Sequence, residues 1–467
     1  MKVVCIGSGY VGSVTGTAFA ALGYETTIID INQKKVDLMN SGKSPIFEPG
    51  LDELIKEYIH KKLFATTSYE VVKEADVIFI GVGTPSKEDG TADLTYIKFA
   101  ANSIAKHLNP NKFTVIVDKS TVPVGTGDVV VDIIEEDTNL QSGVHFAVVS
   151  NPEFLREGYA VEDVFFPDRV IIGSSDEKAK SIMRSLYGNL IERQNYDEIF
   201  KDFNFEQKFK GLKPKYFETD IRSAEMIKYA SNSFLAVKIS YINEIARLSE
   251  TLGANVLDVA KGMGMDSRIG SKFLEVSSGW SGSCFPKDTA ELLATSQAYN
   301  CELSTVKAAM DSNLAMHSYC VEKMERALGT LKDKKISILG LTFKPNTDDA
   351  RKTQARYIIQ KLIDSGAHIK AHDPQGAEMF KELNPDLPVM YCLEKEDVFE
   401  EADGLILLTH WEEYLDIPWE IMKDKMNIPF IFDTRNFLNE NQLLDFGYTY
   451  EGLGIGKNKR PKQILSI

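Results

Sequence analysis

The stretch KVVCIGSGYVG at residues 2–12 decides the fold of the first part of this chain. Its apolar run Val3–Ile6 leads directly into the motif Gly7-x-Gly9-x-x-Gly12, after which small residues recur at helical spacing. A second apolar run then ends at Asp30, eighteen residues beyond Gly12. This order predicts a strand, a helix and a second, parallel strand, with a glycine turn where the first strand meets the helix.

The glycine turn predicts a dinucleotide-binding site. Gly7, Gly9 and Gly12 permit a tight turn and a close approach of the backbone to a pyrophosphate at the helix N-terminus. The Asp30 carboxylate can accept a hydrogen bond from a ribose 2′-hydroxyl and would repel a 2′-phosphate, so NAD is favoured over NADP. The alternative is a glycine-rich turn that binds nothing, but strand, helix and acid are all in place.

The rest of the chain repeats this alternation. Apolar runs separated mostly by helical patterns continue as far as residue 173, and the alternation restarts at residues 335–373. Between these parts, apolar residues at helical spacing run from Asp220 to Gly253, which predicts one long helix buried between domains or subunits. The predicted fold class is α/β, with two Rossmann-like doubly wound domains joined by a long central helix and a helical middle domain.

These patterns also predict the domain boundaries. We expect an NAD-binding Rossmann-like domain at 1–215, the central long helix and a helical dimerisation domain at 216–325, and a C-terminal Rossmann-like domain at 326–467. Residues 191–214 are charged and aromatic without a clean period, and we interpret them as an inserted surface segment.

The composition indicates a folded enzyme of average make-up. Hydrophobic residues are 43% and charged residues 26% of the 467, and the net charge of −15 disfavours nucleic acid as a partner. The 5 cysteines are odd in number and lack C-x-x-C spacing, so we expect neither disulfides nor a metal site, and a reducing cytoplasm fits best. No signal peptide or run of about 18 apolar residues is present, which predicts neither secretion nor a membrane span.

Cys284 is the candidate nucleophile. The sequence GWSGSCFPKD at residues 279–288 changes to a helical pattern after Pro286, and a proline in the first turn would place Cys284 at the helix N-terminus. There the exposed N–H groups and the Lys287 ammonium favour a thiolate, the form that attacks carbonyls. Asp288 shares its helix face. The alternative is a small core residue, which the glycine-rich approach and the charged neighbours disfavour.

Two further features point to a ligand site. Lys228 and Asn232 are four residues apart on the predicted long helix, so a cation and an amide donor could together stabilise an oxyanion; the alternative is a lysine at a helix edge beside a solvated asparagine. Three polar segments directly follow predicted strands, at Gly83–Pro85, Ser120–Pro123 and Asn151–Gly158. They would meet at the carboxyl edge of the sheet, where ligands bind in open α/β folds.

Together these motifs resemble the nucleotide-sugar 6-dehydrogenase family, and within it the enzymes that act on UDP-glucose. The resemblance runs over nearly the whole chain. The segments that carry it are Gly7–Gly12, Phe47–Leu51, Val82–Pro85, Ser120–Pro123, Asn151–Gly158, Pro167–Arg169, Lys228 with Asn232, Arg268–Gly270, Ser283–Asp288 and Phe343–Lys344.

The resemblance implies a four-electron oxidation of the sugar C6 alcohol to a carboxylate with two NAD⁺. In this interpretation Cys284 captures the aldehyde as a thiohemiacetal, which is oxidised to a thioester and then hydrolysed. Lys228 and Asn232 resemble the pair that steadies the oxyanion, Asp288 and Thr121 the groups that handle protons and order water, and Glu153 the carboxylate used in hydrolysis.

The resemblance also implies two binding sets and a homodimer. The cofactor set is Gly7, Gly9, Tyr10, Val11, Gly12, Asp30, Lys35, Thr84, Pro85, Thr121, Glu157 and Arg351. The set for the UDP-sugar, which the C-terminal domain would bind, is Phe154, Leu155, Lys228, Asn232, Arg268, Phe273, Gly279, Phe343, Lys344 and Arg435. Arg268 typically reaches a neighbouring subunit's site in this family, so the central helix is expected to form a dimer.

Three alternatives stay open at this point. Relatives that oxidise UDP-N-acetylhexosamines usually carry G-H-C-I-P at the cysteine, whereas Gly282–Pro286 here reads G-S-C-F-P, which favours glucose. One departure from the family pattern lies beside this motif: Ser281 stands where the family usually has glycine, and its side chain could narrow the space in which the backbone approaches the sugar. A two-electron hydroxyacid dehydrogenase would need no nucleophilic cysteine and no second nucleotide-binding half. An inactive NAD-linked scaffold predicts loss of Cys284, Lys228 or Asp288, and all three are present.

Overall fold

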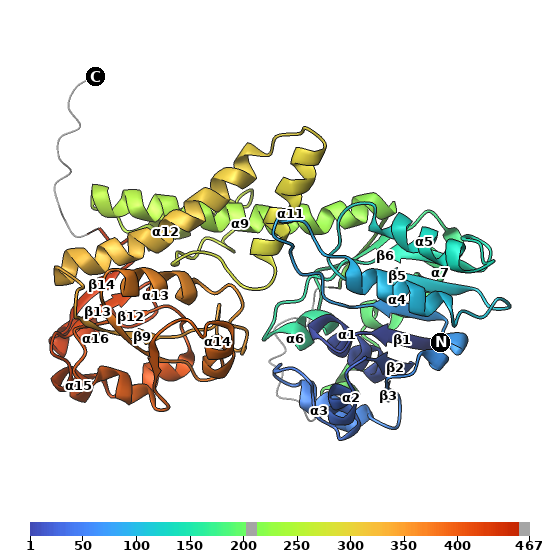
Figure 1. Cartoon of the computed structure of the whole chain (residues 1–467), viewed down its shortest axis with the longest axis horizontal. Helices are drawn as coiled ribbons and strands as arrows, with labels where there is room; N and C mark the ends of the chain where they lie inside the picture. Colours follow the sequence, from blue (N-terminus) through green and yellow to red (C-terminus); the bar gives the residue numbers. More distant parts are fainter. Residues whose placement is uncertain (202–212, 457–467) are drawn as a thin grey trace. The chain divides into compact units, whose positions relative to one another are not determined.

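The computed structural model describes residues 1–201 and 213–456. The chain divides into two compact units, Met1–Ser231 and Asn232–Ile467 (Figure 1).

The first unit is built on an eight-stranded sheet in the order β3-β2-β1-β4-β5-β6-β7-β8. Its neighbouring strands run parallel except β6 and β7, which meet antiparallel at Ser150 and Gly173. The strands are β1 (Lys2–Ile6), β2 (Glu25–Ile29), β3 (Leu63–Thr66), β4 (Val77–Ile80), β5 (Thr114–Asp118), β6 (Phe146–Ser150), β7 (Arg169–Gly173) and β8 (Lys215–Thr219).

Helices cover both faces of this sheet, because both faces are apolar. Val3 and Cys5 of β1 belong to one buried cluster, and Val4 and Ile6 of the same strand belong to another. Alternate residues of a strand point to opposite faces, so a strand buried on both sides needs apolar residues throughout. The helices are α1 (Tyr10–Ala21), α2 (Gln33–Asn40), α3 (Leu51–Tyr58), α4 (Thr95–Ala105), α5 (Thr126–Asp137), α6 (Ala160–Phe165), α7 (Glu177–Ile191) and α8 (Tyr196–Ile199), with a 3₁₀ turn at Tyr69–Glu74.

The second unit repeats the plan with a six-stranded, parallel sheet in the order β11-β10-β9-β12-β13-β14. This is the strand order of the first six strands of the first sheet and that of a dinucleotide-binding fold. The strands are β9 (Lys335–Leu339), β10 (His368–His372), β11 (Val389–Tyr391), β12 (Gly404–Leu407), β13 (Phe430–Asp433) and β14 (Thr449–Gly452).

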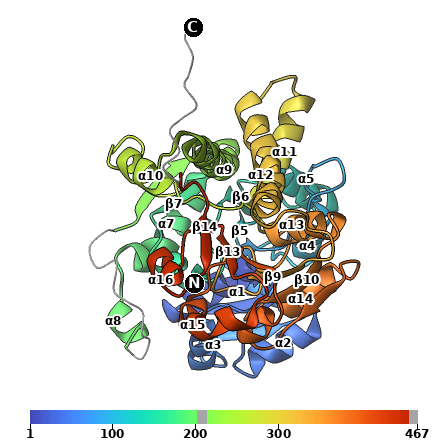
Figure 2. The same ribbon diagram turned by 90° about the vertical axis from the view of Figure 1, so that its left-hand side faces the viewer.

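Helices α12 and α13 of this unit pack side by side (Figures 1 and 2). The helices around the second sheet and before it are α10 (Val256–Gly264), α11 (Phe285–Ala298), α12 (Ser304–Leu328), α13 (Gln354–Asp364), α14 (Ala377–Leu383), α15 (Trp419–Met422) and α16 (Glu440–Asp445), with 3₁₀ turns at Lys395–Phe399, Glu412–Asp416 and Lys423–Lys425.

The long helix α9 spans Ile221–Leu252, so its residues belong to both units. Its second part exposes large apolar side chains at seven-residue spacing, with Phe234 63%, Tyr241 49% and Leu248 52% exposed. Among the described residues these side chains stay about half exposed, so the stripe is accessible to a partner.

The predicted fold class is confirmed, and the element boundaries mostly are. The first strand–helix–strand unit, the long helix and the restart at residue 335 all lie where the sequence places them. The sequence pattern does not predict the short outer strands β3, β8, β11 and β14. Within the predicted insertion, Tyr196–Ile199 forms α8, and residues 202–212 lie outside the described residues. Among the described helices, none is long and apolar enough to cross a membrane.

Candidate active site

Asp30 closes the glycine turn of the first unit. Its Oδ2 accepts hydrogen bonds from the Ser8 N–H at 2.8 Å and the Ser8 hydroxyl at 2.6 Å, and its Oδ1 accepts from the Asn32 N–H at 2.8 Å. Partial burial raises the pKa of Asp30, but these hydrogen bonds and the charge of Lys35 outweigh it, so the pKa lies below its usual range. The carboxylate is therefore ionised and half-exposed, as an acceptor for a ribose hydroxyl must be.

The three glycines of the turn have different surroundings. Gly7 has φ +98°, and a Cβ on Gly12 would lie 1.9 Å from the Gly7 carbonyl oxygen, so both positions require glycine. A Cβ on Gly9 would meet no atom within 4 Å. Gly9 is the N-cap of α1 and no side chain caps the helix there. The first turn of α1 thus begins beside open space at Gly9, which fits a bound pyrophosphate.

The carboxyl ends of β4, β5 and β6 are joined by polar side chains. The Thr84 hydroxyl donates to the Thr121 carbonyl at 2.8 Å, and the Ser120 hydroxyl donates to the Val82 carbonyl at 2.7 Å. The Lys119 ammonium donates to the Asn151 side chain at 3.1 Å. These bonds bring together the three loops that the sequence assigned to one sheet edge.

Glu153 and Lys228 form a buried ion pair in the first unit. Their side chains are 7% and 4% exposed, and Glu153 Oε1 lies 2.9 Å from Lys228 Nζ. The other carboxylate oxygen accepts from the Leu155 N–H at 2.5 Å. Burial raises the pKa of Glu153, but the Lys228 charge and hydrogen bond outweigh it and hold the pKa below its usual range. The site therefore holds an ionised carboxylate beside a cation.

The remaining predicted ligands of the first unit differ in their contacts and exposure. The Lys228 ammonium lies 5.3 Å from the centre of the Phe154 ring, whose face also carries the Arg169 guanidinium at 3.9 Å. Tyr10 donates to the Phe47 carbonyl at 3.4 Å. Val11, Lys35, Leu155 and Glu157 are half-buried, and Pro85 is exposed.

Cys284 begins α11 in the second unit, and its predicted place at a helix N-terminus is confirmed. It is the N-cap residue, with a proline in the first turn, and it is only half-buried. Its sulfur lies 3.6 Å from the Ser283 hydroxyl. The N–H groups of the first turn point toward the thiol end of the helix, which is the arrangement that favours a thiolate.

Asp288 lies one turn further along α11 and is fully buried. Its Oδ2 accepts from the Asn232 amide at 2.6 Å, and its Oδ1 accepts from the Lys287 ammonium at 2.5 Å. The sequence pattern pairs Asn232 with Lys228 and Asp288 with Cys284, whereas in the structure Asn232 and Asp288 are hydrogen-bonded to each other. The Asn232 side chain is thereby oriented by Asp288 and Lys287.

The predicted substrate residues of the second unit fall into two groups. Gly279 and Gly282 precede Cys284, with φ +127° and +86°, and a Cβ on Gly282 would lie 2.8 Å from the Phe343 ring. Phe273 has φ +65°, a strained value for an aromatic residue, and its ring lies 6.3 Å from that of Phe285. These residues form a tight, aromatic surround for the cysteine loop.

The predicted cationic ligands come from segments of the sequence other than the cysteine loop. Lys344 lies 5.2 Å from the centre of the Phe343 ring. Arg435 donates to the Leu408 carbonyl at 2.8 Å, and burial lowers its pKa to about 10. Arg351 forms a two-pronged ion pair with Asp349, and the exposed Arg268 pairs with Asp266.

Several supporting residues were missed. Ser8 holds Asp30, Lys119 lies behind Asn151, and two amides described below hold the cysteine loop. Ser8 stands inside the glycine motif, so its spacing could have identified it. The others meet their partners across 32 to 74 residues, and no local pattern marks them.

Within residues 1–201 and 213–456, no group of three His, Cys, Asp or Glu side chains could hold a metal ion.

The glycine turn, the half-exposed Asp30 and the strand order define a dinucleotide-binding enzyme of the doubly wound α/β class. Comparison with known proteins narrows this. Three domains of the UDP-glucose/GDP-mannose dehydrogenase family match the chain: the NAD binding domain at residues 1–191, the central domain at 222–315 and the UDP binding domain at 337–440.

The chain belongs to the UDP-glucose/GDP-mannose dehydrogenase family. It is 42% identical to the UDP-glucose 6-dehydrogenase YwqF of Bacillus subtilis (strain 168), over 97% of this chain and 98% of that one. A solved UDP-glucose dehydrogenase from Pyrobaculum islandicum superimposes with a TM-score of 0.84 at 33% identity, covering 98% of both chains. A UDP-D-ManNAc dehydrogenase from Pyrococcus horikoshii gives 0.82 at 27% identity, covering 98% and 100%. The protein is accordingly an NAD-dependent dehydrogenase.

Proposed function

We propose that this enzyme oxidises UDP-glucose to UDP-glucuronate with two NAD⁺, through a thioester on Cys284. The observation that carries the proposal is the half-buried Cys284 at the N-terminus of α11, one turn before the fully buried Asp288. A two-electron oxidation has no use for such a thiol. The identity to UDP-glucose 6-dehydrogenases over nearly the whole chain supports glucose as the sugar.

The proposed reaction has three steps, in which atoms and electrons balance. The C6 alcohol first loses a hydride and a proton to give an aldehyde. The Cys284 thiolate adds to the aldehyde carbon, and loss of a second hydride from the thiohemiacetal gives a thioester. Water then cleaves the carbon–sulfur bond, releasing the carboxylate and the thiol. NAD⁺, when bound, supplies the hydride acceptor for each oxidation.

The chain's own residues divide the remaining work. Lys228 and Asn232 are the proposed donors to the oxyanion, and each is already oriented by a carboxylate, Glu153 and Asp288 respectively. Glu153 is ionised and is the proposed base for thioester hydrolysis. Thr121 and Asp288 are the proposed groups that order water and move protons.

Two sets of residues are proposed to hold the ligands. The glycine turn, Asp30, Lys35, Thr84, Pro85, Glu157 and Arg351 would hold NAD. Phe154, Leu155, Arg268, Phe273, Gly279, Phe343, Lys344 and Arg435 would hold the UDP-sugar, where the cations offset a diphosphate charge that the acidic chain as a whole repels.

The stoichiometry of the reaction tests the four-electron route. Purified enzyme given limiting UDP-glucose and excess NAD⁺ should form two NADH per sugar, measured by absorbance. One NADH per sugar with free aldehyde in solution would refute the thioester.

The Cys284→Ser variant tests the nucleophile. It should bind UDP-glucose as the native enzyme does while steady-state turnover falls by about 10³-fold or more, since an alkoxide does not form at this position at neutral pH. Unchanged turnover would remove Cys284 from the mechanism.

A substrate panel tests the sugar. The similarity to a UDP-D-ManNAc dehydrogenase makes UDP-N-acetylhexosamines the second candidate. The value of kcat/KM should be highest for UDP-glucose, and a higher value for an acetamido sugar would transfer the same mechanism to that substrate.

We further propose that two copies associate through α9. Phe234, Tyr241 and Leu248 form an exposed apolar stripe, which is the chemistry of a self-association surface. Analytical ultracentrifugation should show a dimer that the Phe234→Asp variant dissociates. A native monomer at micromolar concentration would contradict this.

The division at 1–215, 216–325 and 326–467 remains our proposal for the domains. A cytoplasmic location remains a prediction, based on the number and spacing of the cysteines.

A further inference from the structure

The segment Ser277–Ser283, which leads into Cys284, is held by side chains from three helices of the second unit. The Ser277 N–H donates to the Asn243 side chain of α9 at 2.9 Å. The Trp280 indole donates to the Ser240 hydroxyl of α9 at 2.9 Å. The peptide of Trp280 itself is held from α12 and α13, and it lies only four residues before the thiol.

Asn313 of α12 pairs with both backbone groups of Trp280. Its Oδ1 accepts from the Trp280 N–H at 2.8 Å, and its Nδ2 donates to the Trp280 carbonyl at 2.9 Å. The side-chain amide thus makes the two backbone hydrogen bonds that a neighbouring β-strand would otherwise make. Asn313 is 6% exposed, so water does not compete for these bonds.

Gln354, the first residue of α13, provides the second donor to the same carbonyl. Its Nε2 hydrogen-bonds the Trp280 oxygen, and its Oε1 faces Nε2 of His317. A carbonyl can only accept, so the amide must turn its NH₂ group to Trp280 and its oxygen to His317. His317 therefore carries a proton on Nε2.

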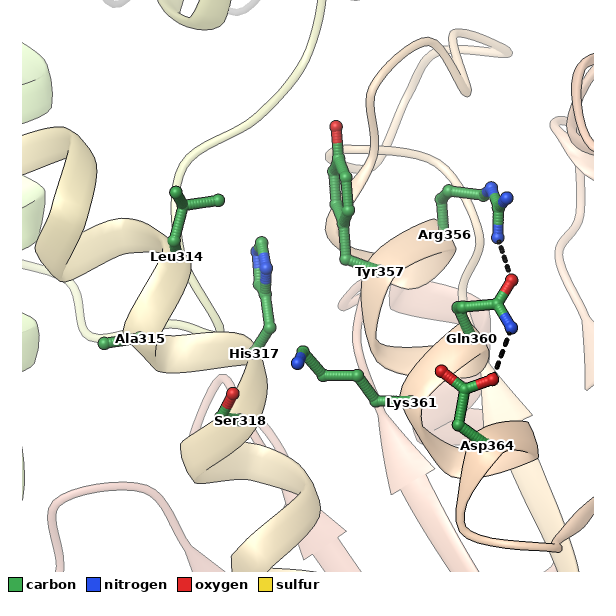
Figure 3. Close-up of a pocket in the computed structure, with 9 residues that line it drawn as sticks. All are labelled: Leu314, Ala315, His317, Ser318, Arg356, Tyr357, Gln360, Lys361 and Asp364. Carbon is green, nitrogen blue, oxygen red and sulfur yellow. Dashed lines mark hydrogen bonds between the residues drawn. The ribbon is translucent and has the colours of Figure 1, made fainter.

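His317 is fixed in turn. It is 2% exposed, and burial lowers its pKa to about 4, so the ring is neutral. Its ring stacks on that of Tyr357 with centroids 4.8 Å apart and planes 3° apart. Figure 3 shows the two rings facing each other in a groove between α12 and α13, with the Lys361 side chain directed toward His317.

The same contacts tie the cysteine loop to the segment between β9 and α13. A Cβ on Gly279 would lie 2.5 Å from Asn313 Oδ1 and 3.1 Å from Gln354 Oε1, and one on Gly282 would lie 2.8 Å from Phe343. Phe343 and Lys344 are proposed to bind the UDP-sugar. Gln354 directly follows that segment as the first residue of α13, so its bond to Trp280 joins the end of the segment to the cysteine loop.

We infer that Asn313 and Gln354, with His317 behind Gln354, are positioning residues that set the Trp280 peptide and thereby place Cys284 against the sugar. We name this set the Trp280 clamp. The inference rests on the proposed role of Cys284. Because small displacements of a reacting group slow chemistry steeply, the clamp should act on kcat more than on the binding of NAD, whose motif lies in the first unit.

The test compares Gln354→Leu with the pair His317→Phe and His317→Gln. Leucine keeps the approximate size of Gln354 but neither donates nor accepts. Phenylalanine keeps the stack on Tyr357 but removes the donor to Gln354, whereas glutamine restores a donor. We expect kcat with UDP-glucose to fall about tenfold or more in Gln354→Leu and His317→Phe, with KM for NAD unchanged and partial recovery in His317→Gln.

A second readout needs no turnover. Alkylation of Cys284 by iodoacetamide, followed by peptide mass spectrometry, should slow in Gln354→Leu and His317→Phe relative to the exposed Cys301 of the same chain. If either variant has a lower melting temperature but keeps the native kcat and the native rate of Cys284 alkylation, the residues are only structural and the inference is wrong. Should Gln354→Leu not fold, the two His317 variants decide.

The two readouts also separate this inference from the proposed function. If the native enzyme fails to oxidise UDP-glucose, the proposed function is wrong, while the ratio of Cys284 to Cys301 alkylation still tests the clamp. If Cys284 reacts equally fast in all variants, the clamp is wrong whatever the substrate.

Discussion

The two Rossmann-like sheets share a strand order but use the acid after the second strand differently. Asp30 follows β2 and Asp373 follows β10, and each accepts hydrogen bonds from the turn after the first strand of its unit, which opens with a glycine at φ +98° or +93°. Asp30 is half-exposed, whereas Asp373 is 5% exposed.

The number of donors explains the difference. Asp373 Oδ2 alone accepts from the Leu341 N–H, the N–H and hydroxyl of Thr342 and the Trp411 indole, at 2.6 to 3.2 Å. Its Oδ1 accepts from two further N–H groups, those of Gln375 and Gly376. No acceptor capacity is left for a ribose. One plan therefore gives a half-exposed carboxylate in the first unit, which we propose binds the ribose, and a buried structural carboxylate in the second.

The helix after the turn differs as well. In the first unit α1 begins at Tyr10, three residues after Gly7, so the glycine turn leads directly into the helix N-terminus. In the second unit α13 begins at Gln354, and residues 340–353 intervene. That longer segment carries Phe343, Lys344 and Arg351. The second half thus keeps the strand order of a dinucleotide domain, and in our proposal these side chains take the place of its phosphate-binding turn.

Asp373→Ala should have the largest effect and should act on stability alone. Removing an acceptor that serves six buried or half-buried donors should cost the second unit about 3 kcal/mol or more. All three tryptophans, Trp280, Trp411 and Trp419, lie in this unit, so urea unfolding followed by tryptophan fluorescence reports on it. Affinity for NAD, measured by calorimetry below the unfolding transition, should match the native protein; a weaker affinity would give Asp373 a ligand role and break the comparison.

Gly12→Ala should abolish the cofactor function of the first half. The new methyl group would lie 1.9 Å from the Gly7 carbonyl, so the turn and the start of α1 must move apart. We expect at least about a 100-fold loss of NAD affinity, since a displaced helix N-terminus no longer meets the pyrophosphate. Gly188→Ala is the matched control, because a Cβ there meets nothing within 4 Å. Equal NAD binding by both variants would contradict the assignment.

Asp30→Ala should have a smaller, selective effect. Loss of one charged hydrogen bond to the ribose predicts about a tenfold weaker binding of NAD, and removal of the negative charge should raise the relative affinity for NADP. Fluorescence titration with both dinucleotides checks this. An unchanged preference for NAD over NADP would mean that Asp30 serves only Ser8 and Asn32, as Asp373 serves only groups of its own unit.

Lys119→Met should produce the smallest effect, a change in the pH dependence of stability. Burial lowers the pKa of Lys119 to about 8, although the nearby Glu153 acts in the opposite direction. The unfolded chain keeps this proton up to its ordinary value of 10.5, so between these pH values it binds more protons than the folded chain, and rising pH favours folding.

From pH 7 to pH 9 this group should therefore add about 1 kcal/mol to native stability, and the methionine variant should lack that gain. Urea unfolding followed by circular dichroism at the two pH values measures it. A parallel response in both proteins would show that Lys119 is not the titrating group.

The sequence predicts well those features that a local pattern encodes. The glycine motif with Asp30 identifies the first turn, and Pro286 after a glycine-rich stretch places Cys284 at its helix N-terminus. By contrast, the roles of Asn313 and Gln354 depend on contacts across 33 and 74 residues, which periodicity does not report. Asp373, like Asp30, directly follows the second strand of its unit, but its burial and its six donors are properties of the folded unit that the sequence does not report.

Glu48 has a consequence for how the first unit is assembled. Its two oxygens accept hydrogen bonds, each 2.7 Å long, from the N–H groups of Gly158 and Ala160, more than a hundred residues further along. The folded form of the segment that begins at Glu153 therefore includes a contact with residue 48. A ribosome releases residue 48 first, so vectorial synthesis delivers the acceptor before the amides that need it.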